Sequence, residues 1–276
     1  MKNGVYDISI EDYHSCEGFS RSKLIHFNRS PRHFWYESFL NNKKQKLADV
    51  IKKSNPLEFG NALHTYVLER DCFFDRYIAM PKVNRVTKVG KEAYQAFLSK
   101  AQGKQIICED TLKEIELMNE SIESHAEAKA LISDAEYEKS LFWTDPDTGI
   151  LCKVRPDIWH NNFICDLKTT ASGSLRNFQK SVYDYSYHIQ AGMIQEALKH
   201  VLNIDMGNFI FVAVEKEAPY AVAVYTLDPM AVSLGVTKFK NILLGIKECQ
   251  ESNNWPSYPT ACIDVPKWAS TDSQIV

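Results

Sequence analysis

The chain has 276 residues, of which 45% are hydrophobic, and a formal net charge of −3 at pH 7. This length and composition predict one globular domain over 1–276, and the near-neutral charge does not by itself indicate a nucleic-acid partner. Because no run of about 18 uncharged apolar residues occurs and residues 1–10 lack a secretory pattern, we expect a cytoplasmic protein without a membrane partner.

Residues 1–56 are expected to form a helical and basic segment. Hydroxyl residues predict helix starts at Ser20 and at Ser30, the second helix extending over 33–40. Nine Lys and Arg side chains occur between residues 21 and 53, interleaved with aromatic residues. The candidates for DNA contact in this segment are Arg21, Lys23 and Arg32.

A catalytic core is expected over 57–228. Apolar residues at helical spacing predict a helix over 61–68. In this helix His64 lies one turn after Gly60, whose missing side chain would let the helix approach a sheet closely. A lone histidine on a helix is also compatible with a purely structural role.

Two oppositely charged stretches follow. Residues 82–104 are basic, whereas residues 109–138 are acidic and include one long predicted helix from Glu109 to about Leu131. The basic stretches are either solvated helix faces or surfaces that bind phosphate, and both interpretations stay open.

Three consecutive antiparallel strands are predicted next, over 140–143, 150–159 and 163–168. An Asp-Pro-Asp-Thr-Gly turn separates the first two strands, and Asn161-Asn162 separates the last two. The three strands together predict an antiparallel meander.

The last two strands bring charged residues together. If Asn161-Asn162 forms a two-residue loop, counting back along both strands places Asp157 opposite Asp166 and Arg155 opposite Lys168. Because strand side chains alternate, all four then share one face. From the residues alone, a surface hairpin with two cross-strand ion pairs remains an alternative.

Directly opposed carboxylates lie only about 5 Å apart at Cβ and repel each other. Mg²⁺ prefers carboxylate and water oxygens and leaves coordination positions for a phosphate. The ammonium of Lys168, two residues beyond Asp166, could orient or deprotonate an attacking water and offset negative charge. Asp157, Asp166 and Lys168 therefore predict a site for phosphodiester hydrolysis.

The remaining chain is expected to supply the rest of an α/β fold of the α+β type. A segment over 229–276 is predicted to hold a final helix and an extended tail. The further predicted helices and strands are 183–200, 209–214, 221–227 and 229–249. A mixed central sheet with the meander, flanked by helices, is the expected architecture.

Several motifs, in this order along the chain, resemble PD-(D/E)XK nucleases of the RecB-like branch. They are Gly60–His64, Pro156-Asp157, Asp166–Lys168 and Tyr183–Gln190. The chain is more similar still to the nuclease domain of the exonuclease VIII (RecE) family, in motifs that extend over nearly its whole length. These motifs are Val5–Ser9, Asp145–Cys152, Arg155–Asp157, Trp255-Pro256 and Pro266–Ala269.

The resemblance implies the role of each site residue. The implied Mg²⁺ ligands, where Mn²⁺ is expected to substitute, are His64, Asp157, Asp166 and the backbone carbonyl of Leu167. Lys168 is implied to be the catalytic lysine, and Arg155 is a further candidate for DNA contact. Glu138 stands where the family often has a further acidic group near the metals, although a solvated glutamate is an alternative. Tyr187 and Gln190 match the motif that contacts the DNA end and supports the site. Ile194 stands where the family often has a tyrosine, and we expect Tyr183 and Ile194 to pack in the core.

The implied activity is processive 5′ to 3′ degradation of linear double-stranded DNA, which leaves 3′ single-stranded tails for phage-type recombination. The implied assembly is a ring-shaped homotetramer that works with a RecT-like single-strand annealing protein. An endonuclease or structure-specific nuclease on the same fold, and a DNA-binding protein without activity, are the alternatives. No Fe–S cluster is expected, because the seven cysteines form no CxxC pair.

Overall fold

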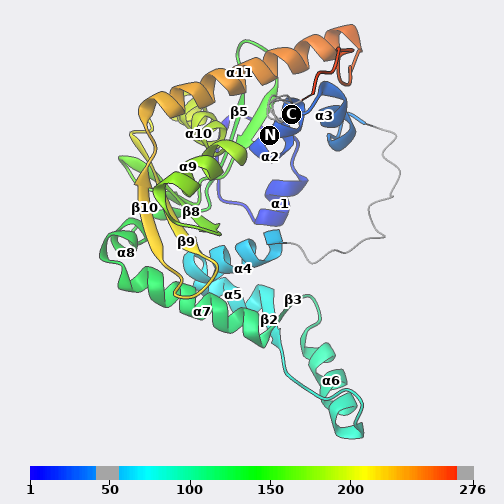
Figure 1. Cartoon of the computed structure of the whole chain (residues 1–276), viewed down its shortest axis with the longest axis vertical. Coiled ribbons are helices and arrows are strands. Elements are labelled where there is room, and N and C mark those ends of the chain that lie inside the picture. The colour runs from blue at the N-terminus through cyan, green and yellow to red at the C-terminus, as the bar shows by residue number, and fades with distance from the viewer. Residues whose placement is uncertain (42–55, 266–276) are drawn as a thin grey trace, which may run out of the picture.

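The computed structural model describes residues 1–41 and 56–265 (Figure 1). The lysines from Lys43 to Lys53 and the Pro266–Ala269 motif lie outside the described residues. Within the described ranges, no helix is both long and apolar enough to span a membrane.

A mixed sheet forms the centre of the molecule. Its strands, in the order β10-β9-β8-β7-β4, pair antiparallel except for β8 and β9, which are parallel. Their bounds are β4 (Glu136–Tyr137), β7 (Ile158–Trp159), β8 (Phe163–Thr170), β9 (Asn208–Glu215) and β10 (Val222–Thr226). The predicted mixed central sheet is therefore confirmed.

Helices cover both faces of this sheet (Figure 1). One layer consists of α9 (Leu175–Asp184), α10 (Tyr187–Leu202) and α11 (Pro229–Ser252). The other consists of α4 (Pro56–Leu68), α5 (Arg70–Arg76), α7 (Glu109–Ser124) and α8 (Ala126–Ile132). Alternate residues of β8 enter different cores, since Ile164 packs with the first layer and Cys165 and Leu167 pack with the second.

Two smaller sheets and several short helices complete the described chain. One sheet has the order β1-β5-β6, and in the other β2 and β3 pair in parallel. Their strands are β1 (Gly4–Tyr6), β2 (Tyr77–Met80), β3 (Gln105–Cys108), β5 (Ser140–Thr144) and β6 (Leu151–Val154). The remaining helices are α1 (Ile10–Ser15), α2 (Arg21–Leu24), the 3-10 helix η1 (Ile25–Asn28), α3 (Pro31–Glu37) and α6 (Lys88–Lys100).

The predicted continuous meander is wrong at one point. Its second strand is split at Arg155–Asp157 into β6, which pairs with β5, and β7, which pairs with β8 in the central sheet. Pro156 has no N–H to donate to a ladder, so the strand breaks there. The break turns Asp157 out of regular pairing at the start of the hairpin.

Two predicted helices are also interrupted. The helix expected from Glu109 to Leu131 ends at Ser124, because His125 takes a non-helical conformation and its Nδ1 caps α8 by accepting from the N–H of Ala128 at 3.2 Å. The helix expected over 183–200 begins only at Tyr187, after Ser186 with a φ of 58°.

The expectation for Gly60 is wrong as well. A Cβ at this position would meet only the Oγ1 of Thr169, at 3.9 Å, so the approach of α4 to β8 does not require a glycine. The close helix crossing lies between α10 and α11 instead. A Cβ on Gly192 would lie 2.4 Å from the backbone nitrogen of Val236, and one on Gly235 would lie 1.8 Å from the carbonyl oxygen of His188.

Candidate active site

The hairpin between β7 and β8 has the predicted register. Ile158 pairs with Cys165 and Trp159 with Ile164, and the N–H of His160 donates to the carbonyl of Phe163 at 3.0 Å. Asp157 stands at a bend one residue before the first ladder pair. The Oδ2 of Asp157 accepts from the N–H of Leu167 at 3.0 Å, which fixes this carboxylate against β8.

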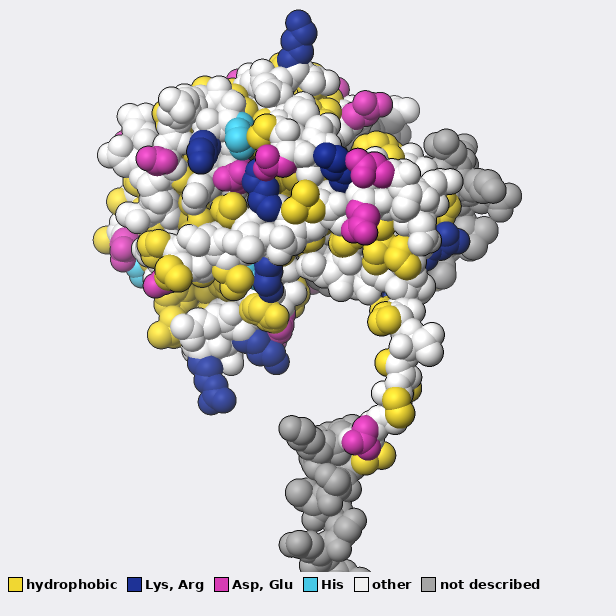
Figure 2. Space-filling model, turned by 90° about the horizontal axis from the view of Figure 1, so that it is seen from above, with side chains coloured by type: hydrophobic (Ala, Val, Ile, Leu, Met, Phe, Trp, Pro, Cys, Tyr) yellow, Lys and Arg dark blue, Asp and Glu magenta, His cyan; other side chains and the backbone are white. Residues whose placement is uncertain are grey.

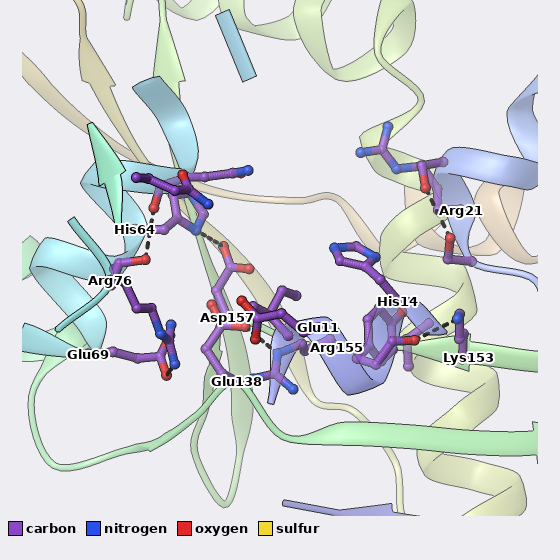
Figure 3. A pocket seen from close by; sticks show the side chains of 18 of the residues that line it. Glu11, His14, Arg21, His64, Glu69, Arg76, Glu138, Lys153, Arg155 and Asp157 are labelled. Atoms are coloured by element: carbon purple, nitrogen blue, oxygen red, sulfur yellow. Dashed lines mark hydrogen bonds and ion pairs between the residues drawn. The ribbon is translucent and has the colours of Figure 1, made fainter. Parts of the chain in front are cut away.

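Three side chains from separate elements converge beside this hairpin. The possible ligand atoms of His64, Glu138 and Asp157 all lie within 4.8 Å of one another. His64 Nδ1 is 3.5 Å from Asp157 Oδ2, and Figure 3 shows both side chains and Glu138 facing a common space. We call these three residues the ligand cluster.

Glu138 is held in place by its backbone and by Arg155. Its φ is 54°, a conformation that residues other than glycine rarely adopt, and its N–H donates to the carbonyl of Asp157 at 3.1 Å. Arg155 Nε donates to Glu138 Oε2 at 2.6 Å. Burial, with the neighbouring charge of Asp157, raises the pKa of Glu138 to about 8.

Arg155 points inward rather than toward solvent. Its side chain is 8% exposed, and its Nη1 donates to the carbonyl of Ile8 at 2.9 Å and to Ser140 Oγ at 2.7 Å. Together with the hydrogen bond to Glu138, these contacts pair the guanidinium with acceptors of the protein itself. The side chain thus positions Glu138 on the wall of the cavity that both residues line, and its contact with DNA stays a prediction.

Asp166 and Lys168 lie beside the ligand cluster and form an ion pair. Gln190 Nε2 donates to Asp166 Oδ1 at 2.7 Å, and the Lys168 Nζ lies 5.1 Å from the centroid of the Tyr187 ring. Asp166 is 1% exposed, and burial, together with the charge of Asp157, raises its pKa to about 6 against the opposing effect of Lys168. The four residues from β8 and α10 therefore form one contacting group around the buried Asp166.

A cavity of about 670 Å³ opens onto the ligand cluster. Arg21, from α2, lies on its wall across from the cluster (Figure 3). The Nη1 of Arg21 donates to the carbonyl of Tyr185 at 2.6 Å, and its guanidinium lies 5.8 Å from the Tyr187 ring centroid. A cation is therefore present on the wall opposite the carboxylates.

The ligand cluster has the composition of a divalent-metal site. Two carboxylates and one imidazole offer oxygen and nitrogen donors, a set that accommodates Mg²⁺ through the oxygens and Mn²⁺ through both. The raised pKa of Glu138 reflects a buried position near another carboxylate, and a bound cation would compensate for both. The residues present therefore fit such an ion.

Comparison with known proteins identifies the family of the chain. Residues 20–265 match a family model described as "PDDEXK-like domain of unknown function (DUF3799)". The chain belongs to this family. The fold is thus that of the PD-(D/E)XK nucleases, and the family, the fold and the ligand cluster together support a metal-dependent nuclease.

A solved structure agrees with the family at the level of the fold. The crystal structure of a "Putative exonuclease" from Eubacterium rectale is 15% identical to this chain, covers 93% of it and 97% of its own length, and has a TM-score of 0.60. A second structure, SSO0001, is 13% identical and covers 67% of this chain and 85% of its own, but its TM-score of 0.29 carries no argument. No curated protein matches the chain significantly in sequence.

The other basic residues expected to contact DNA lie away from the cavity. Lys23 is exposed and its Nζ donates to the carbonyl of Glu37 at 3.3 Å, and the exposed Arg32 stacks 4.8 Å from the Trp35 ring centroid. The core packing expected for Tyr183 is wrong, because this side chain is 63% exposed at the end of α9. Ile194 is buried as expected.

The cavity also contains residues that the sequence did not indicate. Lys153 is 4% exposed, and its Nζ donates to the carbonyls of Tyr13 at 2.7 Å and Cys16 at 2.6 Å, which joins α1 to β6. Glu69 and Arg76 form a paired hydrogen bond at 2.7 and 3.1 Å on another part of the wall. The Lys153 contacts join segments more than 130 residues apart, so no local pattern in the sequence could have revealed them, whereas the Glu69–Arg76 pair spans only the length of α5.

Proposed function

We propose that the protein is a Mg²⁺-dependent exodeoxyribonuclease that degrades linear double-stranded DNA from 5′ ends. The observation that carries the proposal is the convergence of the ligand cluster on one wall of a cavity, with Arg21 on the opposite wall and the Asp166–Lys168 ion pair behind the cluster on β8. Carboxylates for a cation, an ammonium and an opposing guanidinium are the groups that phosphodiester hydrolysis requires.

Each of these residues has a separate task. A bound Mg²⁺ would polarise the scissile phosphate and lower the pKa of a coordinated water. Asp157, Glu138 and His64 would hold the ion, with Asp166 and the Leu167 carbonyl proposed as further ligands.

The surrounding residues orient the groups that touch the substrate. Lys168, as the cation of a buried ion pair, offsets negative charge on the phosphate in the transition state and orients the attacking water. Gln190 holds Asp166, and Arg155 holds Glu138, so both carboxylates are oriented before DNA arrives. Arg21 is placed to bind a phosphate next to the one that is cleaved.

The exonuclease assignment rests on resemblance to the exonuclease VIII (RecE) family and on the name of the Eubacterium rectale protein. With it we propose processive 5′ to 3′ resection, a ring-shaped homotetramer, a RecT-like single-strand annealing partner in phage recombination, and a cytoplasmic location. An endonuclease could use the same hairpin, so the requirement for a DNA end is the decisive property.

Digestion of matched linear and covalently closed circular duplexes tests the proposal. The linear duplex carries a different label at each 5′ and 3′ end, and each reaction is run with Mg²⁺ and again with a chelator. We expect early release of the 5′ label, survival of the circle and no reaction without the metal. Nicking or linearisation of the circle would assign an endonuclease, and Mg²⁺-independent cleavage would contradict the proposed mechanism.

A further inference from the structure

Residues 81–104 form an arm that projects from the body of the molecule (Figure 1). The chain leaves the body at β2, passes through a loop into α6, and returns at β3. The arm thus begins and ends on two adjacent parallel strands. At 1.5 Å per residue, the 13 residues of α6 span about 20 Å.

Contacts within the arm define its shape. Thr87 caps α6, its Oγ1 accepting from the N–H of Gly90 at 3.0 Å, and the guanidinium of Arg85 stacks 3.9 Å from the Tyr94 ring centroid. A Cβ on Gly90 would lie 1.8 Å from the carbonyl oxygen of Asn84, so the loop and the helix are in backbone contact. The arm is therefore a preformed element and not an unstructured loop.

The exposed surface of the arm is basic. Residues 82–104 contain six Lys and Arg against one acidic residue, Glu92. Lys88, Lys91 and Lys100 are exposed, and across the described ranges none of them forms an ion pair. Helical spacing places Lys88 and Lys91 on the same face as Gln95, a further hydrogen-bond donor. Such a face suits a polyanion whose negative charges are evenly spaced.

The arm rises from the rim of the catalytic cavity. Tyr77, Gly103 and Gln105, at its base, line the same cavity as His64 and Asp157. The surface of the molecule over α11 differs from the arm in its charge, because there Lys and Arg side chains lie beside Asp and Glu side chains (Figure 2). The base of the arm thus borders the cavity, and Lys82 near the base is paired with Asp110, whereas the lysines of α6 are carried away from the body (Figure 1).

We propose that this arm binds the phosphate backbone of duplex DNA whose end is held in the catalytic cavity, an inference that rests on the proposed nuclease function. A span of about 20 Å corresponds to roughly six base pairs at 3.4 Å each. The acidic helix α7, which follows β3, repels DNA and limits the duplex to the opposite side of the arm. The arm thereby guides intact duplex toward the ligand cluster without reading its sequence.

Binding of DNA by the full chain, measured in chelator so that no cleavage occurs, tests this inference. Fluorescence anisotropy of a 30-base-pair duplex over a series of salt concentrations compares wild type with the arm variant Lys88→Ala/Lys91→Ala/Lys100→Ala. The control variant Lys113→Ala/Lys180→Ala/Lys199→Ala removes three exposed lysines from α7, α9 and α10, which also form no ion pair within the described ranges, and changes net charge equally. Hydrolysis of bis(p-nitrophenyl) phosphate in Mn²⁺ reports separately on the metal site, and light scattering reports on oligomeric state.

The arm variant should bind the duplex about tenfold or more weakly, and the slope of log affinity against log salt should shrink by about 2 to 3, because each phosphate contact contributes about 0.9. The control should change affinity less than about twofold, and both variants should hydrolyse the small phosphodiester like wild type. Equal binding by the two variants would overturn the inference. If the oligomeric state changes in the arm variant alone, the arm mediates contacts between copies of the chain, and the inference is overturned. The exposed Val86 and Val89 at the start of the arm would account for such contacts. If arm-dependent binding persists while wild type fails to cut DNA, only the nuclease proposal fails.

Discussion

At the scale of single residues, the hairpin was predictable and the ligand cluster was only partly so. Asn161-Asn162 set the register of the hairpin, which brings Asp157 against β8, because the loop and the alternation of side chains are both local properties. The resemblance implied an acidic group near the metals at Glu138, but the contacts that hold it there were not predictable. Its place depends on a positive φ and on an ion pair with Arg155, neither of which has a local sequence signal.

Arg155 should matter for stability because its guanidinium donates hydrogen bonds to Glu138, to the Ile8 carbonyl and to Ser140. Replacement by methionine removes these bonds, so the free energy of unfolding should fall by about 1–3 kcal/mol in urea denaturation at pH 7 without metal. The loss should grow as the pH rises above about 8, where Glu138 becomes charged beside no partner, and the double variant Arg155→Met/Glu138→Gln should remove this growth. A single variant as stable as wild type would show that the ion pair does not hold Glu138.

At the scale of helices and strands, the periodicity of hydrophobic residues predicted most of the helices and strands but not the points at which they are interrupted. The strand predicted over 209–214 corresponds to β9, and the helix predicted from Pro229 begins at that residue. The breaks at His125 and Ser186 are set by cap geometry and backbone conformation, which residues of these types do not specify. The prediction that Gly60 lets a helix approach the sheet closely was wrong, because the close backbone contacts are at Gly192 and Gly235, where α10 and α11 cross.

The crossing of α10 and α11 gives a matched pair of tests. A methyl group at Gly192 would lie 2.4 Å from a backbone nitrogen of α11, so Gly192→Ala should lower the free energy of unfolding by about 1–3 kcal/mol. Gly60→Ala has space at 3.9 Å and should stabilise α4 by about 0.5–1 kcal/mol, since alanine has the higher helix propensity. Thermal or urea denaturation measures both, and the same sign for the two changes would refute this account of the packing.

At the scale of the whole molecule, the site is assembled across the central sheet. His64 comes from the α4 layer, whereas Gln190, which holds Asp166, comes from the α10 layer. Asp157 lies just before β7, so His64 reaches it from one layer while Gln190 reaches Asp166 of β8 from the other. Sequence motifs named most of these residues, but contacts between segments about 90 residues apart become evident only in the folded chain. The arm likewise appeared in the sequence only as a basic stretch.

The most direct test of the account is the rate at which purified wild type and Asp157→Asn degrade an end-labelled linear duplex in Mg²⁺. The substitution retains the size of the side chain and an oxygen acceptor for the Leu167 N–H, but removes the charge at the centre of the ligand cluster. We predict that the variant keeps its fold and binds DNA in chelator while its cleavage rate falls by at least about 10³-fold, as expected when electrostatic stabilisation of the transition state is lost. Cleavage by folded Asp157→Asn at a rate near that of wild type would contradict the assignment of this site.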